Sequence, residues 1–504
     1  IGFEGASFRF PQTTIDLTGG LVIGKWQPDF DFKIRSKDLS EVDRIFQNFL
    51  AAGGSKAEAL GLGGSGEVSG HLGGRWTEPD AVAQVTAEDA RYAGVLFGSV
   101  RGSVDMREGA FFFRPLRVYD GDATLSLEGM ARYRVVPGRP RFDLALAANR
   151  YPLSRLLEYL DLKFPVDGRV TGAFPVSGTP EALTGGGAIT LADATVWGQK
   201  FAQMTGSVLF TPGRLALEDL RASLGQGMLG GRGALSLRDR TFEARLAGDN
   251  IPVDAINAFA SSTKDVSGRL SFQLSGGGSL DRPDLKVTAS LADATFFGHA
   301  LPEGREPRLE ATIAAGVLDA VAEVPSRWSL KARGDVFGQP ARVDVSLDAP
   351  DLASFLLMTP FALPAGRGGS VAVEGSLTLP VKSGDLPTGE FRMTRARLDL
   401  PERPGVLATS GVVRMSLGNG RLTLQDFQAT GEGTELKAGG WMDLGGKPGG
   451  MNLALSGKID AALLALEFPN LGLSGRVVLD VRAGGTLSAP TSPARFEWKT
   501  ENTG

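Results

Sequence analysis

The chain has 504 residues, of which 42% are hydrophobic and 22% charged, and its formal net charge is −4. Its length exceeds what one hydrophobic core normally serves, and it has no basic stripe or Lys/Arg run of the kind that marks nucleic-acid binding. The absence of cysteine excludes a disulfide scaffold. No run of about 18 apolar residues is present to cross a bilayer as a helix, and because both ends resemble the middle of a protein, we expect a fragment of a longer chain.

The sequence repeats at intervals near one hundred residues. Alternating segments begin at Arg141, Thr241, Ala341 and Met451, and LADATVWG at 191–198 returns as LADATFFG at 291–298. Internal periodicity of this kind is typical of repeat architectures. We expect repeats over 1–140 (N-terminally incomplete), 141–240, 241–340, 341–448 and, in part, 449–504.

The repeating segments alternate apolar and polar residues with a period of two. In RFDLALAA, Phe142, Leu144 and Leu146 share one face, while Asp143 and Ala145 point the other way. This pattern predicts antiparallel strands with one dry face. A one-residue bulge would reverse the facing of every residue after it. The predicted dry-face residues are Phe142, Leu144, Leu146, Leu235, Leu237, Leu270, Phe272, Leu274, Val343, Val345, Leu347, Leu453, Leu455, Val477, Leu479 and Val481.

One short amphipathic helix interrupts each repeat. In YPLSRLLEYLDL, Leu153, Leu156, Leu157 and Leu160 lie at helical spacing and Pro152 suits the first turn. Helices of ten to thirteen residues do not hold alone, so each is expected to dock on the sheet. The other predicted helices are DLSEVDRIFQNFL, IPVDAINAFA, PDLASFLLM and KIDAALLALEF.

No linker composition separates the repeats, since ALSLRD runs into RTFEARL across Arg240 without a change in composition. We therefore predict a mainly β fold in which one curled antiparallel sheet continues across the repeat borders. One short helix per repeat is too little to roof about eight strands. Either two halves of the sheet close on each other, or the apolar face stays open as a binding surface for acyl chains.

The ordered set of phrases resembles the AsmA-like/TamB family of bacterial envelope proteins. The phrases are YPLSRLLEYL, LADATVWG, GRLALEDLRASLGQGMLGGRGALSLRD and GRLTLQDFQATGEGTELKAGGWMDLGG. The resemblance implies a β-taco, or repeating β-groove, tethered to the inner membrane of a diderm bacterium and crossing the periplasm. It also implies phospholipid as the cargo and a BamA-like outer-membrane barrel as a partner. The family's anchor helix and barrel-contacting domain have no match in this sequence.

Several motifs that could carry chemistry have simpler explanations. Gly225 to Gly230 match G-x-G-x-x-G, but a strand follows instead of the helix that a dinucleotide site needs, and the motif recurs in phase, so we predict a hairpin turn. His71 and His299 lie far apart without neighbouring acids in the sequence, so no metal set is predicted and each is assigned to a turn. Asp193 and Asp293 recur in phase and are predicted to face solvent.

The aromatic residues leave alternatives open. For Phe111, Phe112 and Phe113 a strand that is dry on both faces is the leading explanation, with an edge bulge or lipid contact as the other. Trp197, Phe296 and Phe297 end the ADA strands, where core packing and a groove rim are equally compatible with the sequence.

These patterns favour a non-enzymatic protein without cofactor, metal or nucleic-acid partner. The leading hypothesis is a periplasmic groove that binds phospholipid acyl chains and helps to conduct lipid between the inner and outer membranes. The alternatives are a TamB-like scaffold or chaperone for outer-membrane protein assembly and secretion, which pairs with client strands at a sheet edge, and a mechanical spacer with a self-filled core.

Overall fold

Strand accounts for 77% of the structure and helix for 7%, which confirms the predicted mainly β fold. The computed structural model describes residues 2–22, 27–52, 61–75, 78–108, 110–132, 141–159, 165–179, 182–257, 266–359, 367–380, 386–400, 403–443, 450–461, 475–486, 489–491 and 494–499. Two compact units make up the chain, Ile1–Leu246 (unit 1) and Ala247–Gly504 (unit 2). The strand β15 (Thr241–Pro252) contains the division.

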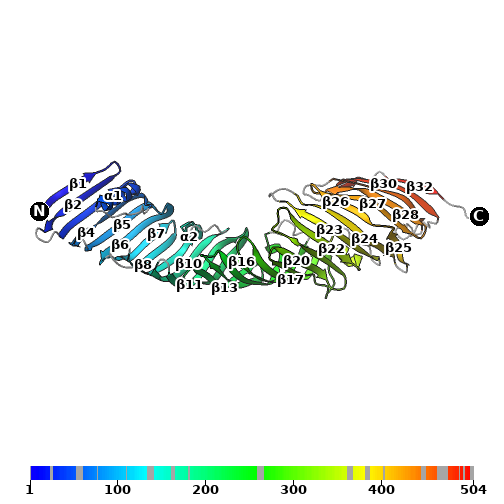
Figure 1. Ribbon diagram of the computed structural model, residues 1–504, viewed down its shortest axis with the longest axis horizontal. Coiled ribbons are helices and arrows are strands. Elements are labelled where there is room, and N and C mark those ends of the chain that lie inside the picture. Colours follow the sequence, from blue (N-terminus) through cyan, green and yellow to red (C-terminus); the bar gives the residue numbers. More distant parts are fainter. Residues whose placement is uncertain are drawn as a thin grey trace, which may run out of the picture. The chain divides into compact units, whose positions relative to one another are not determined.

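Unit 1 is an antiparallel meander in which each strand pairs with the next along the chain, so its strands lie side by side in chain order (Figure 1). Its elements are β1 (Gly2–Arg9), β2 (Thr13–Val22), β3 (Gln27–Ser36), α1 (Leu39–Ala52), β4 (Gly63–Arg75), β5 (Glu78–Tyr92), β6 (Val95–Arg107), β7 (Ala110–Asp120), β8 (Ala123–Arg132), β9 (Arg141–Pro152), α2 (Leu153–Tyr159), β10 (Val166–Thr179), β11 (Ala182–Val196), β12 (Gln199–Thr211), β13 (Arg214–Leu224) and β14 (Gly227–Ser236).

Unit 2 repeats this plan, but at three places two strands pair with different parts of one neighbour: β18 and β19 with β17, β25 and β26 with β24, and β31 and β32 with β30. β25 and β26 pair with the two ends of β24, so together they occupy one strand position. Its elements are η1 (Val253–Ala255), β16 (Val266–Ser279), β17 (Pro283–Phe296), β18 (His299–Ala300), β19 (Arg308–Ala314), β20 (Val317–Val324), β21 (Trp328–Asp335), β22 (Ala341–Ala349), α3 (Leu352–Leu356), β23 (Gly368–Leu379), β24 (Thr388–Leu400), β25 (Arg403–Thr409), β26 (Val413–Gly418), β27 (Arg421–Gly431), β28 (Thr434–Asp443), β29 (Met451–Asp460), β30 (Arg476–Thr486), β31 (Ala489–Thr491) and β32 (Ala494–Lys499).

The sheet crosses three of the predicted repeat borders. The border at 140/141 falls between β8 and β9, which pair in register from Thr124–Asn149 to Arg132–Arg141. The border at 340/341 falls between the paired strands β21 and β22, and that at 448/449 between β28 and β29. Separate sealed domains would show no such pairing, so at these three borders adjacent repeats share one sheet.

Helices occur at the predicted places but are mostly shorter than the apolar pattern indicated. α1 covers the expected segment, whereas α2 ends at Tyr159 and α3 spans five residues. At the third place only a 3-10 turn forms, η1, before residues outside the described ranges. The fifth predicted helix begins too early, because Lys458 to Asp460 belong to β29, and its residues after Ala461 lie outside the described ranges.

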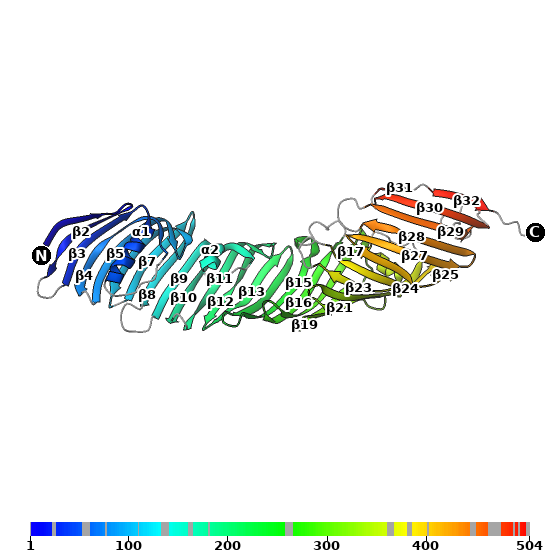
Figure 2. The same cartoon turned by 45° about the horizontal axis from the view of Figure 1, so that its top comes forward.

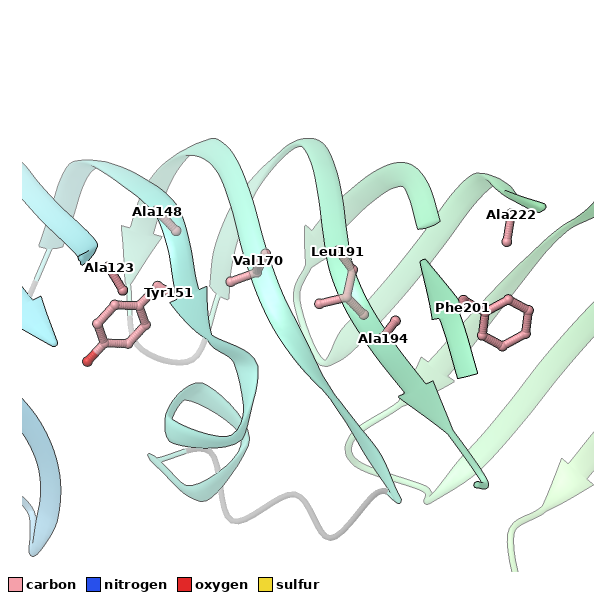
Figure 3. Packing of buried hydrophobic residues seen from close by; sticks show 8 residues of the cluster. All are labelled: Ala123, Ala148, Tyr151, Val170, Leu191, Ala194, Phe201 and Ala222. Atoms are coloured by element: carbon pink, nitrogen blue, oxygen red, sulfur yellow. The ribbon is translucent and has the colours of Figure 1, made fainter. Parts of the chain in front are cut away.

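The largest apolar cluster of unit 1 lies where α2 docks on the sheet. Ala148 and Tyr151 of β9, Val170 of β10 and Leu191 of β11 are buried there, and the strands that carry them arch over the cluster (Figure 3). Leu153 and Leu156 of α2 pack against these residues. We call this contact, made by the four sheet residues and the two leucines, the α2 seat.

The corresponding contact in unit 2 is the α3 seat, formed by buried residues of β20 to β23 and by Phe355 of α3. Val324, Trp328, Ala349 and Val371 are its buried members. The rings of Trp328 and Phe355 lie edge to face, with centroids 6.1 Å apart. The α3 seat therefore joins a short helix to strands on both sides of a predicted repeat border, and in unit 1 the cluster around the α2 seat also includes Ala123 of β8, across the border at 140/141.

Candidate functional site

One line of apolar side chains crosses all fourteen strands from β1 to β14. Directly opposite residues of an antiparallel pair point to the same face of the sheet, so the register of each pair places the next member on the same face. We call this line inner row 1, and the face that carries it the inner face. Its members are Ala6, Leu17, Phe32, Gly70, Ala83, Val104, Phe113, Gly129, Leu144, Val176, Gly185, Phe210, Leu215 and Leu235.

Unit 2 carries an equivalent line, inner row 2, across β16 to β30. Its members occupy thirteen strand positions and are likewise apolar or glycine. They are Leu274, Val287, Ala311, Ala320, Ala332, Val345, Gly375, Phe391, Met415, Leu424, Gly440, Leu453 and Ala483.

Every member of both rows is half-buried. The inner face of a closed sandwich would be buried, because a second layer would remove it from water. Among the described residues, therefore, no continuous layer covers the rows, and the cover that the helices provide is local: α1 contacts β2, β3 and β4, η1 contacts β16, and α2 and α3 lie at their seats. Long uncovered apolar strips are rare on soluble proteins and mark sites of interaction.

Glycines in the rows allow the sheet to bend toward its inner face. Gly129 has a φ of +120°, and a Cβ on it would come within 2.2 Å of the Asp143 carbonyl oxygen on the neighbouring strand. Gly440 has a φ of +138°, and its Cβ would lie 2.0 Å from the Asn452 oxygen. Side chains at these positions would push the strands apart, so glycine permits the close approach that a curved sheet needs.

A hydrogen bond across four strands shows the curl of unit 1. The Tyr151 hydroxyl on β9 donates to the Phe97 carbonyl oxygen on β6 at 2.8 Å. Three strand spacings separate these backbones by about 14 Å in a flat sheet, which is longer than a tyrosine side chain. Burial, together with the charge of Asp120, raises the pKa of Tyr151 to about 12, so the hydroxyl keeps its proton at ordinary pH.

The opposite, outer face is polar where the inner face is apolar. On β9, Phe142, Leu144 and Leu146 are half-buried, whereas the alternate residues Asp143 and Ala145 are exposed. The same alternation holds on β29, where Leu453 and Leu455 are half-buried between exposed neighbours. The rows contain no titratable or nucleophilic side chain, so they offer contact with apolar groups and no acid–base or covalent chemistry.

Most of the predicted dry-face residues lie on the inner face with apolar partners opposite. Leu270, Phe272 and Leu274 face Leu291, Ala289 and Val287 of β17. The half-buried members of the predicted set are Phe142, Leu144, Leu146, Leu235, Leu270, Phe272, Leu274, Val345, Leu347, Leu453, Leu455 and Val481.

Four of the predicted residues do not fit an open lining. Leu237 lies in the turn after β14 and is 52% exposed, because the strand ends at Ser236. Val343, Val477 and Leu479 are buried, at 5%, 2% and 6% exposure. Val477 and Leu479 belong to a cluster with Leu436 and Ala461. These three valine and leucine side chains pack in the interior, where a ligand has no access.

The assignment of His71 to a turn is wrong. His71 lies within β4 on the outer face, where the neighbouring strand β3 brings two acids to it: Nδ1 is 2.9 Å from Asp31 Oδ1, and Nε2 is 3.4 Å from Asp29 Oδ1. Sequence distance hid this contact, because β3 and β4 pair across the α1 segment. Even so, no group of metal-ligating side chains occurs among the described residues. His299 directly follows a turn and is exposed.

Asp193 and Asp293 face solvent, as predicted. Both adopt positive φ, 51° and 49°, within strands β11 and β17. Aspartate tolerates this left-handed conformation better than most residues, which explains its return in phase. Asp193 lies 3.9 Å from Arg150, and Asp293 pairs with Arg269.

The predicted hairpin at Gly225 is confirmed, since β13 and β14 meet at Leu224 and Gly227 around a two-residue turn. The ADA strands end in turns, where Trp197 is 74% and Phe297 36% exposed, while Phe296 is half-buried. Phe111 and Phe113 share the inner face, and Phe112 points outward under the Arg107 guanidinium, 5.2 Å from its ring centroid. β7 is thus half-buried on both faces, and a bulge follows Phe113.

Among the described residues no helix is both long and apolar enough to span a bilayer. No family model, curated protein or solved structure matches the chain.

Proposed function

We propose that the inner face binds the acyl chains of phospholipids and that the protein helps to conduct lipid between two membranes, without enzymatic chemistry. The observation that supports this is the unbroken apolar character of inner rows 1 and 2, half-buried on strand after strand. A ligand made of repeated methylenes matches such a lining, since each methylene removed from water contributes about 0.8 kcal/mol. The rows carry no polar group to fix one position, so a chain is free to move along them.

The setting of this activity follows from the resemblance described above. We propose the periplasm of a diderm bacterium, a tether to the inner membrane and a BamA-like outer-membrane barrel as a partner. Headgroups would remain in solvent outside the inner face, so binding is expected to be indifferent to lipid class.

A scaffold for outer-membrane protein assembly is the second candidate. Among the described strands β1 pairs only with β2, so its other edge is open to strand addition. A client strand held there would contact the backbone of β1 and leave the inner rows untouched.

Native mass spectrometry of the purified chain tests the proposal. The variant Leu144→Asp, Phe272→Asp, Val345→Asp places charges on the inner face and should lose co-purifying phospholipid. Its matched control, Ala145→Asp, Gln273→Asp, Ser346→Asp, changes the adjacent outward residues and should retain it. Equal loss in both variants would overturn the assignment of faces.

Photolabelling keeps the test informative if the inner variant folds poorly. A phospholipid with a diazirine in its acyl chain, incubated with the unaltered protein, should label peptides that contain Leu215 and Leu424. Labels confined to the outer face would contradict the proposal, whereas crosslinks of client strands to β1 without acyl labelling would favour the scaffold.

A further inference from the structure

The outer face of β6 to β9 concentrates arginine. These four strands lie side by side (Figures 1 and 2), and their outward positions alternate with the inner-face residues Val104, Phe113, Gly129 and Leu144. Six of the seven arginines in these strands share this face with the acids Asp105, Glu128 and Asp143, and no lysine occurs in the four strands. The seventh, Arg150, lies near the end of β9 with a positive φ and pairs with Asp122 and Asp193. The six are Arg101, Arg107, Arg114, Arg117, Arg132 and Arg141; with Phe112 and Met130 they form what we call the arginine face.

Two pairs of these arginines lie directly opposite each other. Arg101 faces Arg117 across β6 and β7, and Arg132 faces Arg141 across β8 and β9. Like charges directly opposite destabilise a sheet. Arg101 has a carboxylate 3.6 Å away on Glu88, but within the described part of the chain no acid pairs with Arg117, Arg132 or Arg141. Among the described residues, therefore, no acid offsets the repulsion between Arg132 and Arg141, and at the other pair Glu88 offsets only the charge of Arg101.

A buried acid holds two of the other arginines in place. Asp105 is 7% exposed, and its Oδ2 lies 2.6 Å from Arg114 Nη2 and 3.5 Å from Arg107 Nη2. Arg107 also stacks over Phe112. Their guanidinium groups are about half exposed, so Asp105 and Phe112 fix their positions and leave donors facing solvent.

Two strands further along the sheet, β10 and β11, carry little charge. From Thr171 to the end of β10, and on β11 up to Ala192, no charged residue is present. Phe112 and Met130 are also apolar residues on the polar side of the sheet, opposite each other in register.

We propose that the arginine face binds an acidic polypeptide segment of a partner protein. Arginine, aromatic residues and methionine are the types enriched at protein interfaces, where lysine is depleted. Guanidinium groups bind carboxylates through paired hydrogen bonds, and acidic side chains would relieve the repulsion at both opposed pairs. Phe112 and Met130 supply the apolar contact between them. This surface is independent of the inner rows.

Fluorescence anisotropy with a labelled twelve-residue peptide of alternating Glu and Leu tests the proposal on the whole chain. Arg117→Gln, Arg132→Gln, Arg141→Gln together should weaken binding at least tenfold. The matched control, Arg221→Gln, Arg232→Gln, Arg238→Gln, removes three exposed arginines of unit 1 outside the arginine face and should change affinity less than twofold. The same peptide with Gln in place of Glu should not bind.

Two further measurements distinguish an acidic polypeptide from other ligands of the arginine face. Phe112→Ala should weaken the Glu–Leu peptide several-fold while leaving oligoglutamate binding unchanged, because only the former uses an apolar contact. Vesicles of phosphatidylglycerol are the competing partner: if the arginine-face variant loses vesicle binding and keeps peptide binding, the proposal is overturned.

Thermal unfolding verifies that the variants are folded. Arg132→Gln should not lower the melting temperature, because it removes a repulsion. Equal loss in the control variant also overturns the proposal.

Discussion

The α2 seat and the α3 seat solve the same problem by different means. Each holds a short helix against the inner face beside a predicted repeat border. In the α2 seat an apolar and aromatic cluster does this: Tyr159 of the helix lies 5.9 Å from the ring of Tyr92 and 5.8 Å from that of Phe97. Below it Tyr151 is fully buried, and its hydroxyl has the Phe97 carbonyl as acceptor.

The α3 seat relies on charge. Asp351 caps the helix by accepting hydrogen bonds from the Ser354 backbone and hydroxyl at 3.1 and 2.7 Å, and its Oδ2 lies 2.7 Å from Arg327 Nη1. Arg305, from the segment after β18, donates to Ser354 Oγ at 3.3 Å. The buried Trp328 contributes apolar contact, but its Nε1 has no acceptor among the described residues.

This difference teaches what a docked helix of five to seven residues needs. Such a helix is too short to be stable through its own hydrogen bonds, so it depends on tertiary contacts. Apolar packing supplies these contacts at α2, and a helix cap with charged partners supplies them at α3. The two seats should therefore fail under different perturbations.

The largest effect is expected at Tyr151. Tyr151→Ala removes a fully buried ring and its hydrogen bond from β9 to β6, and should lower the free energy of unfolding by about 3–5 kcal/mol. Hydrogen exchange of peptides 95–107 and 151–159 should accelerate together. Tyr159→Ala is the comparison: it removes a ring that is 46% exposed and its contacts with Tyr92 and Phe97, and should cost less, about 1 kcal/mol. Similar losses for both variants would show that the seat does not depend on Tyr151.

Extremes of pH should separate the seats. With the pKa of Tyr151 raised to about 12 from 10, its contribution is complete below pH 10 and is lost as pH rises through 12, on the order of 3 kcal/mol. For Asp351, burial acts to raise the pKa, but hydrogen bonds from Ser354 and the Arg327 guanidinium outweigh it and hold the pKa below its usual range. Its contribution is therefore present above about pH 4 and is lost as pH falls through the folded pKa.

Calorimetric melting from pH 3 to pH 12 checks this contrast. Tyr151→Phe should remove the alkaline loss only, and Asp351→Asn the acid loss only. An acid transition that survives in Asp351→Asn would assign it to another carboxylate.

The β architecture and the inner face followed from the sequence because side-chain alternation is local. Leu144 lies on the inner face and Ala145 on the outer face, as the period of two predicts. The same logic failed at Leu237, where a turn begins one residue early, and at Val343, Val477 and Leu479, which share the correct face but are covered. Cover is a tertiary property, and the local pattern of apolar residues does not encode it.

Sequence analysis did not predict the arginine face, because its residues are brought together only by the pairing of strands. Arg101, Arg117, Arg132 and Arg141 are separated by nine to sixteen residues, so no basic run marks them, and only strand register brings them together. The same holds for His71 and its two aspartates. A comparison of the outward-facing residues on adjacent predicted strands could have revealed both groups.

The smallest effect is expected at Trp328, whose buried indole N–H has no acceptor among the described residues. Trp328→Phe deletes a buried N–H that has no acceptor, and removing such a donor offsets the apolar volume that is lost with it. Unfolding free energy should change by less than about 1 kcal/mol. Tyr151→Phe, also a deletion of one polar group, breaks a buried hydrogen bond and leaves the Phe97 carbonyl without that donor, which should cost about 1–3 kcal/mol. Chemical denaturation of both variants compares the two directly. Should Trp328→Phe prove as costly as Tyr151→Phe, the indole N–H is bonded in solution, and a buried polar contact stabilises the sheet at the α3 seat as it does at the α2 seat.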